Sequence, residues 1–289
     1  MPPQGDREFT DSYTSYRYGA PTPQALFSPI VKPLKIAALA CALLTPLTVT
    51  AAAHASAYPV KNPVLVKNAL YQAGPLPTTT CNDLPDEPMT PAEARTYINE
   101  ALRCLENTWG QHLKKAGLPY EPVKVRYVTR LPKNYCASED GETIQPSTVW
   151  YCDWDRTLSF KIGKYWLLGP ITGLDLFNTI AVTYGYHVQK QAGLYDAGED
   201  LRAGSKAEHL EQGRRMYQQV ECLGAAFTKS VWPLPGKTAR DWERVASSFY
   251  RDSAEYGKAA NRKRWVKAGF RTADPASCNT WAAASSKVS

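Results

Sequence analysis

Residues 173–191 read GLDLFNTIAVTYGYHVQKQ, and apolar side chains recur in them at alternating spacings of three and four. The recurring residues are Leu174, Phe177, Ala181, Tyr184 and Val188. This period is that of one face of an α-helix, so the stretch predicts a helix over 173–191 that buries its apolar face. Positions 182, 183 and 186 lie off that face.

Helices and short strands are predicted on both sides of this helix. Thr90-Pro91-Ala92-Glu93 combines a capping box with proline at the first helical position, so a helix begins there and ends at Gly117. Alternation in VKVRYVT (residues 123–129) predicts a strand, and TVWYC and TLSFKI predict a hairpin around residues 153–156. Further helices are predicted over residues 205–230, 239–256 and 259–268. The expected class is α+β, with a small antiparallel sheet followed by a mainly helical half.

The first 57 residues predict export. Residues 1–31 are polar and rich in Tyr, Ser, Thr and Pro, which is typical of a disordered extension. Residues 32–57 place two lysines before an apolar run and end in Ala-Ser-Ala, the pattern of a signal peptide. A membrane anchor over residues 36–53 is the alternative, because their length is at the lower limit for spanning a bilayer. We expect a secreted or extracytoplasmic protein, cleaved after Ala57 or associated with a membrane through residues 36–53.

Six cysteines follow this segment, while Cys41 lies inside its apolar run. An even number of cysteines without a CxxC pair favours disulfides over a structural zinc site. Composition cannot choose among the 15 connectivities of six cysteines, and we adopt sequential pairing as the prediction. The predicted pairs are Cys81–Cys104, Cys136–Cys152 and Cys222–Cys278. Residues 58–89 hold six prolines and predict an extended segment, followed by one domain at residues 90–289.

The overall charge is modest. The formal net charge is +7, and no basic stripe interleaved with aromatic residues is evident in the sequence. The sequence therefore lacks the charge pattern that is typical of nucleic-acid-binding proteins, and no nucleic-acid partner is expected. The surplus suits solubility or affinity for an anionic cell envelope.

The helix predicted at residues 173–191 has the spacing of a zinc-protease helix without its zinc-binding residues. A zincin carries His, Glu and His at positions i, i+1 and i+4, where the histidines bind one zinc ion and the glutamate activates its water. The corresponding positions here hold Val182, Thr183 and Tyr186. None of them is a conventional zinc ligand or a carboxylate base.

The strings TIAVTYGYHVQ and YQQVEC resemble two motifs of the bacterial neutral zinc metallopeptidase family. The helix motif of that family reads AHEYGHHVQ and is matched at Ala181, Tyr184, Gly185, His187, Val188 and Gln189. The second motif, ELQADC, supplies the third zinc ligand, and its counterpart is residues 217–222. There Glu221 replaces the aspartate, and Tyr217 stands at the ligand position.

Three further strings, VWYCDWDRTLSF, RKRWVKAGF and DPASCNTW, resemble other family motifs in the same order. The resemblance spans residues 90–281 and implies a zincin-like fold for residues 90–289, with a cleft between sheet and helices. It also implies that Val182, Thr183, Tyr186 and Tyr217 occupy the positions of the zinc ligands and the base. We therefore expect no catalytic residue, no bound zinc and no other cofactor.

The histidines do not rebuild a metal site. His54 lies in the signal segment, His112 is expected to be exposed on the first helix, and His209 is expected on a solvated, charged helical turn. His187 is expected to be partly buried and hydrogen-bonded to the backbone, because a catalytic zinc site needs three protein ligands.

These observations favour an inactive pseudoprotease that binds an unidentified peptide, protein or cell-envelope ligand. The candidate residues of the ligand cleft are Thr183, Tyr184, Tyr186, His187, Tyr217 and Glu221. The other use of Tyr186 and Tyr217 is to fill the space that zinc left. An active zinc peptidase that uses His187, Glu221 and a third group is the alternative function, and a structural envelope protein without a ligand is another.

Overall fold

The computed structural model of the chain describes most of the sequence after residue 59. The described residues are 60–81, 84, 88–130, 135–137, 147–167, 173–248 and 250–289. The predicted disordered extension, signal peptide and anchor, with Cys41 and His54, lie outside these residues.

Helices make up most of the described chain, and a small three-stranded sheet is formed by the segment between the second and third of them, which confirms the α+β class. The helices are α1 (Pro63–Val66), α2 (Pro91–Lys115), α3 (Lys164–Leu167), α4 (Gly173–Gln191), α5 (Leu194–Glu199), α6 (Lys206–Ser230), α7 (Ala239–Ser248) and α8 (Ala259–Thr272). The strands are β1 (Lys124–Tyr127), β2 (Thr148–Cys152) and β3 (Thr157–Lys161).

Local sequence signals set the ends of the long helices. Thr90 and Glu93 form the predicted capping box of α2, in which the Glu93 N–H donates to Thr90 Oγ1 at 3.2 Å. Ser205 caps α6 through a 3.2 Å bond from the Glu208 N–H. Both contacts satisfy amide groups that the first helical turn leaves without partners. The helices predicted at residues 173–191 and 205–230 are thus confirmed.

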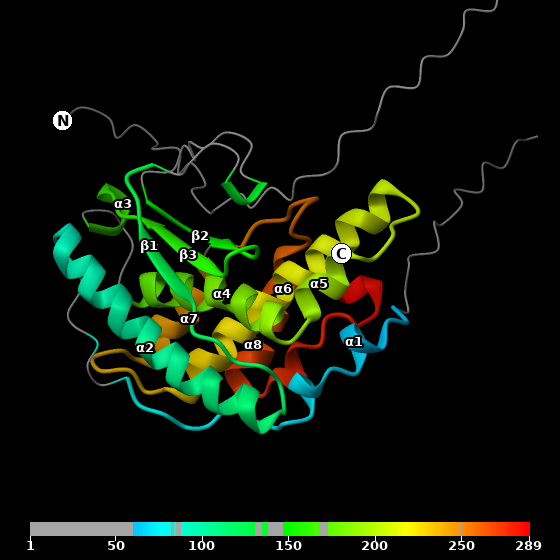
Figure 1. Ribbon diagram of the computed structural model, residues 1–289, viewed down its shortest axis with the longest axis horizontal. Coiled ribbons are helices and arrows are strands. Elements are labelled where there is room, and N and C mark those ends of the chain that lie inside the picture. The colour runs from blue at the N-terminus through cyan, green and yellow to red at the C-terminus, as the bar shows by residue number, and fades with distance from the viewer. Residues whose placement is uncertain are drawn as a thin grey trace, which may run out of the picture.

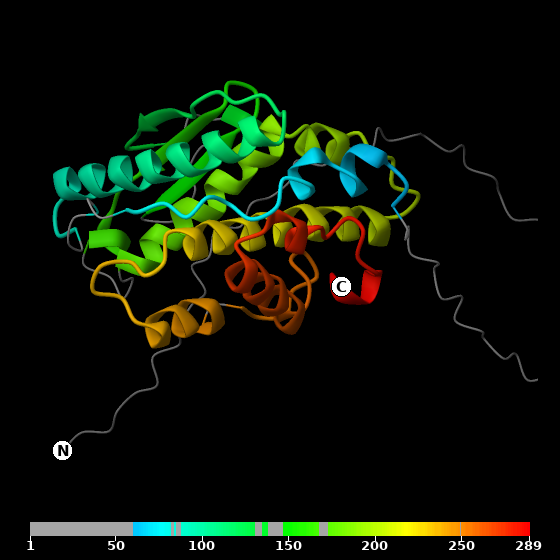
Figure 2. The same cartoon turned by 90° about the horizontal axis from the view of Figure 1, so that it is seen from below.

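The elements form three layers (Figures 1 and 2). The sheet and α2 lie on one side, α4 and α6 lie in the middle, and α7 and α8 form the layer farthest from the sheet. Within this arrangement α6 packs against both α4 and α8, while α4 also contacts β2. The central pair of helices is therefore covered on both sides by protein.

The sheet is mixed, so the prediction of an antiparallel sheet was wrong in part. Its strand order is β1-β3-β2, with the β2–β3 hairpin antiparallel as expected and β1 parallel to β3. The hairpin is fixed by its short turn, where Arg156 adopts a φ of 57°. The chain between β1 and β2 is long enough to cross over, which places β1 beside β3 in the same direction.

Three segment predictions also require correction. The helix predicted at residues 239–256 ends at Ser248, because α6 side chains bind the backbone beyond it: Arg214 Nε donates to Ala254 O at 2.9 Å. The chain then turns at Gly257, where φ is 86°. Helix α8 continues four residues past the predicted end at Ala268. Residues 58–89 are not uniformly extended, since they contain α1 and a short 3₁₀ helix at Ala69–Tyr71.

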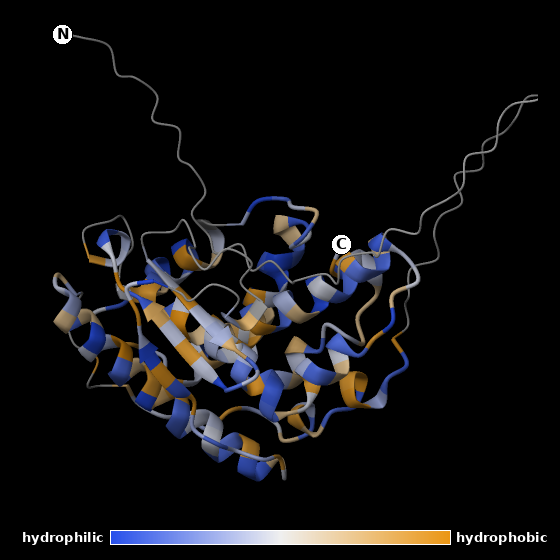
Figure 3. Cartoon of the chain, turned by 45° about the horizontal axis from the view of Figure 1, so that its top comes forward, coloured by the Kyte–Doolittle hydropathy of each residue, from blue (hydrophilic) through white to orange (hydrophobic). Residues whose placement is uncertain are grey.

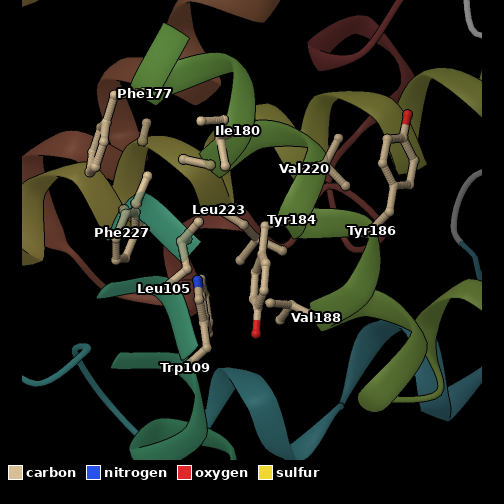
Figure 4. Packing of buried hydrophobic residues seen from close by; sticks show 14 of the residues in the cluster. Leu105, Trp109, Phe177, Ile180, Tyr184, Tyr186, Val188, Val220, Leu223 and Phe227 are labelled. Carbon is tan, nitrogen blue, oxygen red and sulfur yellow. The ribbon is translucent and has the colours of Figure 1, made fainter. Parts of the chain in front are cut away.

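Apolar side chains from α2, α4 and α6 meet in one core (Figure 4). Trp109 of α2 faces Tyr184 of α4, while Phe177 and Phe227 stack with ring centroids 5.6 Å apart. The apolar face predicted for residues 173–191 is buried throughout. Hydrophilic and hydrophobic residues alternate along α2, as expected for a helix that packs on one face (Figure 3).

The three predicted disulfides are present: Cys81–Cys104, Cys136–Cys152 and Cys222–Cys278. Their presence indicates an oxidising, extracytoplasmic environment. Within the described ranges, no helix combines the length and the apolar character that crossing a bilayer requires.

Candidate functional site

The positions where the resemblance expects a zinc site lie on α4 and α6, two helices that cross with their backbones in close contact. A Cβ atom on Gly185 would lie 2.9 Å from Val220 Cβ, and one on Gly224 would lie 2.8 Å from the Val182 nitrogen. Glycine at each point lets the two helices approach this closely. The crossing therefore brings the segment around Val182 alongside α6.

On α4, the positions where the resemblance expects zinc ligands and a base hold side chains that pack within the protein. Thr183 is buried, and its Oγ1 donates to the Thr179 carbonyl at 2.9 Å, a bond within the helix itself. The Tyr186 side chain is only 4% exposed, and its ring centroid lies 6.4 Å from that of Tyr195. Val182 presents only carbon atoms beyond its backbone. This end of the crossing carries no formal charge.

On α6, the equivalent region holds a buried ion pair. Arg262 of α8 reaches α6, and its Nη2 lies 2.6 Å from Glu221 Oε1, with both side chains almost wholly buried. The same nitrogen lies 3.4 Å from the hydroxyl of Tyr217, which is 7% exposed. Glu221 therefore has a cationic partner that the sequence alone does not identify.

Three tyrosine rings surround this guanidinium. Its central carbon lies 5.2 Å from the ring centroid of Tyr217, 4.5 Å from that of Tyr250 and 5.4 Å from that of Tyr256. Aromatic faces attract a cation through their negative quadrupole. Burial alone would lower the pKa of Arg262, but the Glu221 carboxylate outweighs that effect and raises the pKa. Arg262 is therefore a permanent positive charge in this part of the molecule.

These residues do not fit a zinc ion. The Val182 side chain offers no ligand atom, and the Glu221 carboxylate is held by a guanidinium, which repels a second cation. Among the described residues, the group with metal-ligand geometry is Cys136, Cys152 and Asp155. Its two cysteines are joined in a disulfide, so they supply no thiolate.

Both ring nitrogens of His187 also contact other groups of the protein. Its Nε2 lies 2.8 Å from the Glu121 carbonyl oxygen, and its Nδ1 lies 3.2 Å from the Tyr151 hydroxyl. This arrangement places a proton on Nε2 and leaves Nδ1 as the acceptor. Burial lowers the pKa of His187 to about 4, so the ring is neutral at neutral pH. The expected backbone hydrogen bond is thus present, and neither ring nitrogen is available to a metal.

The candidate cleft residues do not converge on one point. Figure 4 shows Tyr184 and Tyr186 pointing in different directions from α4, with Tyr184 facing Trp109. Burial, together with the charge of nearby Glu106, raises the pKa of Tyr184 well above the usual tyrosine value. Tyr184 therefore belongs to the core beneath α2, away from the Glu221–Arg262 ion pair.

The prediction that His112 is exposed was wrong. Its side chain is 1% exposed, lies edge-on to Trp109 at a centroid distance of 5.8 Å, and approaches the Leu70 carbonyl. The 3₁₀ helix at Ala69–Tyr71 covers this face of α2, which the helical pattern alone could not reveal. His209 is exposed, as predicted.

Sequence reasoning missed Arg262, Tyr250 and Tyr256. Arg262 begins the string RKRW, which contains three cations in four residues. Spacing along the chain could not select which of them points inward. A buried glutamate at 221 was the available signal, because a buried carboxylate requires a cationic or hydrogen-bonding partner.

Comparisons with known proteins find relatives that carry no assigned activity. The chain is 26% identical over 210 residues to the uncharacterized protein YpfJ of Escherichia coli K12, covering 65% of this chain and 72% of that protein. It is 23% identical over 220 residues to the uncharacterized protein Rv2575 of Mycobacterium tuberculosis H37Rv, covering 64% of this chain and 73% of that protein. No family model and no solved structure matches the chain.

Proposed function

We propose that this protein is an extracytoplasmic, catalytically inactive relative of the neutral zinc metallopeptidases that acts by binding a peptide, protein or envelope ligand. The observation that carries the proposal is the buried Glu221–Arg262 ion pair beside Tyr217. In an active zincin the corresponding region must hold a metal ion and a base that activates its water. Here it holds an internal cation.

The chemistry of the matched positions supports the absence of hydrolysis. Thr183 cannot act as a carboxylate base, and its hydroxyl is engaged with a helix carbonyl. Tyr186 and Tyr217 offer phenol hydroxyls in place of the imidazole, thiolate or carboxylate groups that hold zinc in proteins. No set of three ligands and a base remains at the α4–α6 crossing.

The burial of the tyrosines bears on where the ligand binds. Tyr186 and Tyr217 are both nearly inaccessible, which supports the reading that they fill space. A ligand would then bind at the protein surface, while the α4–α6 crossing serves as its rigid support. Three disulfides and a continuous core provide such a support.

Metal analysis of the purified protein tests the proposal. We expect substoichiometric zinc after equilibration with the metal and gel filtration, and no peptide cleavage above a mock preparation. A variant with Val182→His, Thr183→Glu, Tyr186→His and Tyr217→Glu is the matched control for recovery of metal binding. One equivalent of zinc in the unmodified protein, together with proteolysis that a chelator abolishes, would show that it is an active metallopeptidase.

A further inference from the structure

The net positive charge of the chain is confined to its C-terminal part. Residues 229–289 contain 12 Lys and Arg against 5 Asp and Glu, a surplus equal to the +7 of the whole chain. Residues 1–228 contain 22 of each kind and are formally neutral. A modest average over the whole sequence therefore conceals a basic region made of α7, α8 and the segments around them.

Helix α8 concentrates this charge on one face. At 100° per residue, Lys263, Arg264, Lys267 and Arg271 fall within an arc of about 100°. The face on the other side, which includes Arg262, is buried. Arg264, Lys267 and Arg271 are exposed and Lys263 is half-buried. Helix α8 contains no Asp or Glu, so its outward face, here named the basic face, is a continuous row of cations.

Within the described part of the chain, one member of this row forms an ion pair. Lys267 pairs with Glu243 of α7 at 2.7 Å. Among the described residues, Lys263, Arg264 and Arg271 form no ion pair, although the charge of Lys263 also acts on the Glu243 carboxylate. The contrast with Arg262, which is fully paired on the same helix, shows that the basic face is not needed to neutralise buried acids. Its field is directed into solvent.

Aromatic side chains lie along one edge of the basic face. Phe270 stacks on Trp242 with a centroid distance of 4.2 Å and meets Trp232 edge-on at 5.4 Å. Lys229 extends over the Phe270 ring at 5.6 Å. Phe270 and Trp232 are half-buried, so part of each ring borders the surface. A row of cations beside partly exposed aromatic rings suits the interface between a bilayer and water.

We propose that the basic face of α8 docks this protein on an anionic phospholipid membrane. The layer of α7 and α8 lies farthest from the sheet, so α8 can approach a flat surface without obstruction by the sheet layer (Figure 2). The row from Lys263 to Arg271 spans about 12 Å along the helix. The three disulfides place the protein outside the reducing cytosol, which favours a lipid surface over a nucleic acid. This proposal goes beyond the absence of catalysis and does not depend on it.

Vesicle sedimentation tests the docking surface. Each Lys or Arg near an anionic bilayer strengthens binding about fivefold, so three unpaired cations contribute about 100-fold. We expect the protein to bind vesicles of phosphatidylglycerol and phosphatidylcholine at low salt, and to dissociate as ionic strength rises. The variant Lys263→Gln/Arg264→Gln/Arg271→Gln should bind about 100-fold more weakly.

A matched variant separates local charge from net charge. Lys61, Lys67 and Lys115 are exposed on the part of the molecule that carries α1 and α2. The variant Lys61→Gln/Lys67→Gln/Lys115→Gln loses the same charge and should bind within about threefold of the unmodified protein. All three proteins keep the same N-terminus, so any contribution of residues 36–53 is common to them.

Four outcomes would overturn the proposal. They are equal loss of binding in both variants, no loss in the α8 variant, equal binding to neutral phosphatidylcholine vesicles, and tighter binding to soluble polyphosphate than to anionic vesicles at the same phosphate concentration. The circular dichroism and the urea midpoint of the α8 variant should match those of the unmodified protein, because its three side chains are at the surface. The vesicle-binding and stability results for these variants do not depend on whether the protein binds zinc.

Discussion

Helices α4 and α6 differ in the side chains that they place at the positions where the sequence resemblance expects a zinc site. On α4 these positions hold side chains without formal charge, Val182, Thr183 and Tyr186, which pack against neighbouring elements. On α6 the region keeps an acid, Glu221, and α8 supplies the cation that balances it. A packed side chain without charge can be replaced by another of similar volume at little cost in stability, whereas a buried charged side chain depends on one specific partner. The two helices should therefore respond to mutation to different extents.

The largest effect is expected at the α6 end. Arg262→Met leaves the Glu221 carboxylate buried without a partner, and removing one member of a buried ion pair destabilises a protein by about 3–5 kcal/mol. Urea denaturation followed by tryptophan fluorescence measures this change.

A double variant provides the control for this prediction. Glu221→Leu combined with Arg262→Met removes both charges, and we expect it to recover most of the stability lost in the single variant. A single variant that loses less than about 1 kcal/mol would mean that the ion pair is not buried as described.

The second prediction concerns the stability of the protein at acid pH and His187 of α4. The pKa of His187 is about 4 in the folded protein, while an unfolded histidine titrates near 6.5. Below pH 6.5 the unfolded chain takes up a proton that the folded ring does not, so stability falls with pH down to about 4. The expected loss from His187 is about 3 kcal/mol over that window, and it is absent above pH 7.

Comparison with His187→Gln isolates this contribution. Glutamine does not titrate, so the variant should show a flatter decline in urea midpoint between pH 6.5 and 4. Burial also lowers the pKa of His112, which has the same sign and remains in both proteins. Parallel pH profiles for the two proteins would show that His187 takes up its proton equally in the folded and unfolded states, so that burial does not lower its pKa.

The difference between α4 and α6 also shows what the sequence could predict. Their helical extents follow from local periodicity and turn chemistry, and these predictions were confirmed. The partner of Glu221 lies 41 residues away, on α8. Only the tertiary fold chooses Arg262 over Arg264 for that contact.

The other differences between the predicted and the observed structure also arise from contacts between segments that are distant in the sequence. The parallel placement of β1 depends on a crossover, and the end of α7 depends on Arg214 binding the backbone at Ala254. The burial of His112 depends on a segment that arrives from residues 69–71. The basic face of α8 was hidden by averaging charge over the whole chain. Each of these features requires knowing which distant segments meet.

The third prediction tests the close approach of the two helices. Gly224→Ala adds a Cβ that would lie 2.8 Å from the Val182 nitrogen and 2.9 Å from its Cα, so backbone must move. We expect a loss of about 2 kcal/mol in unfolding free energy. Gly213 lies on the same helix with nothing within 4 Å of an added Cβ, so Gly213→Ala should stabilise by about 0.5–1 kcal/mol. Equal effects at the two sites would contradict the close crossing.

The smallest effect is expected at Thr183, which stands where the resemblance places a catalytic base. Thr183 on α4 and Thr228 on α6 are both buried, and each donates a 2.9 Å hydrogen bond to the carbonyl four residues earlier in its helix. Thr→Val keeps the shape and removes a bond to a carbonyl that the helix already satisfies, so each variant should lose less than about 1 kcal/mol. Thr228 does not correspond to any catalytic position and is therefore the matched control. If Thr183 only packs, both variants should unfold at similar urea midpoints and bind vesicles equally. A much larger change at Thr183 than at Thr228, in stability or in binding, would show that α4 has kept a polar role that its neutral packing does not suggest.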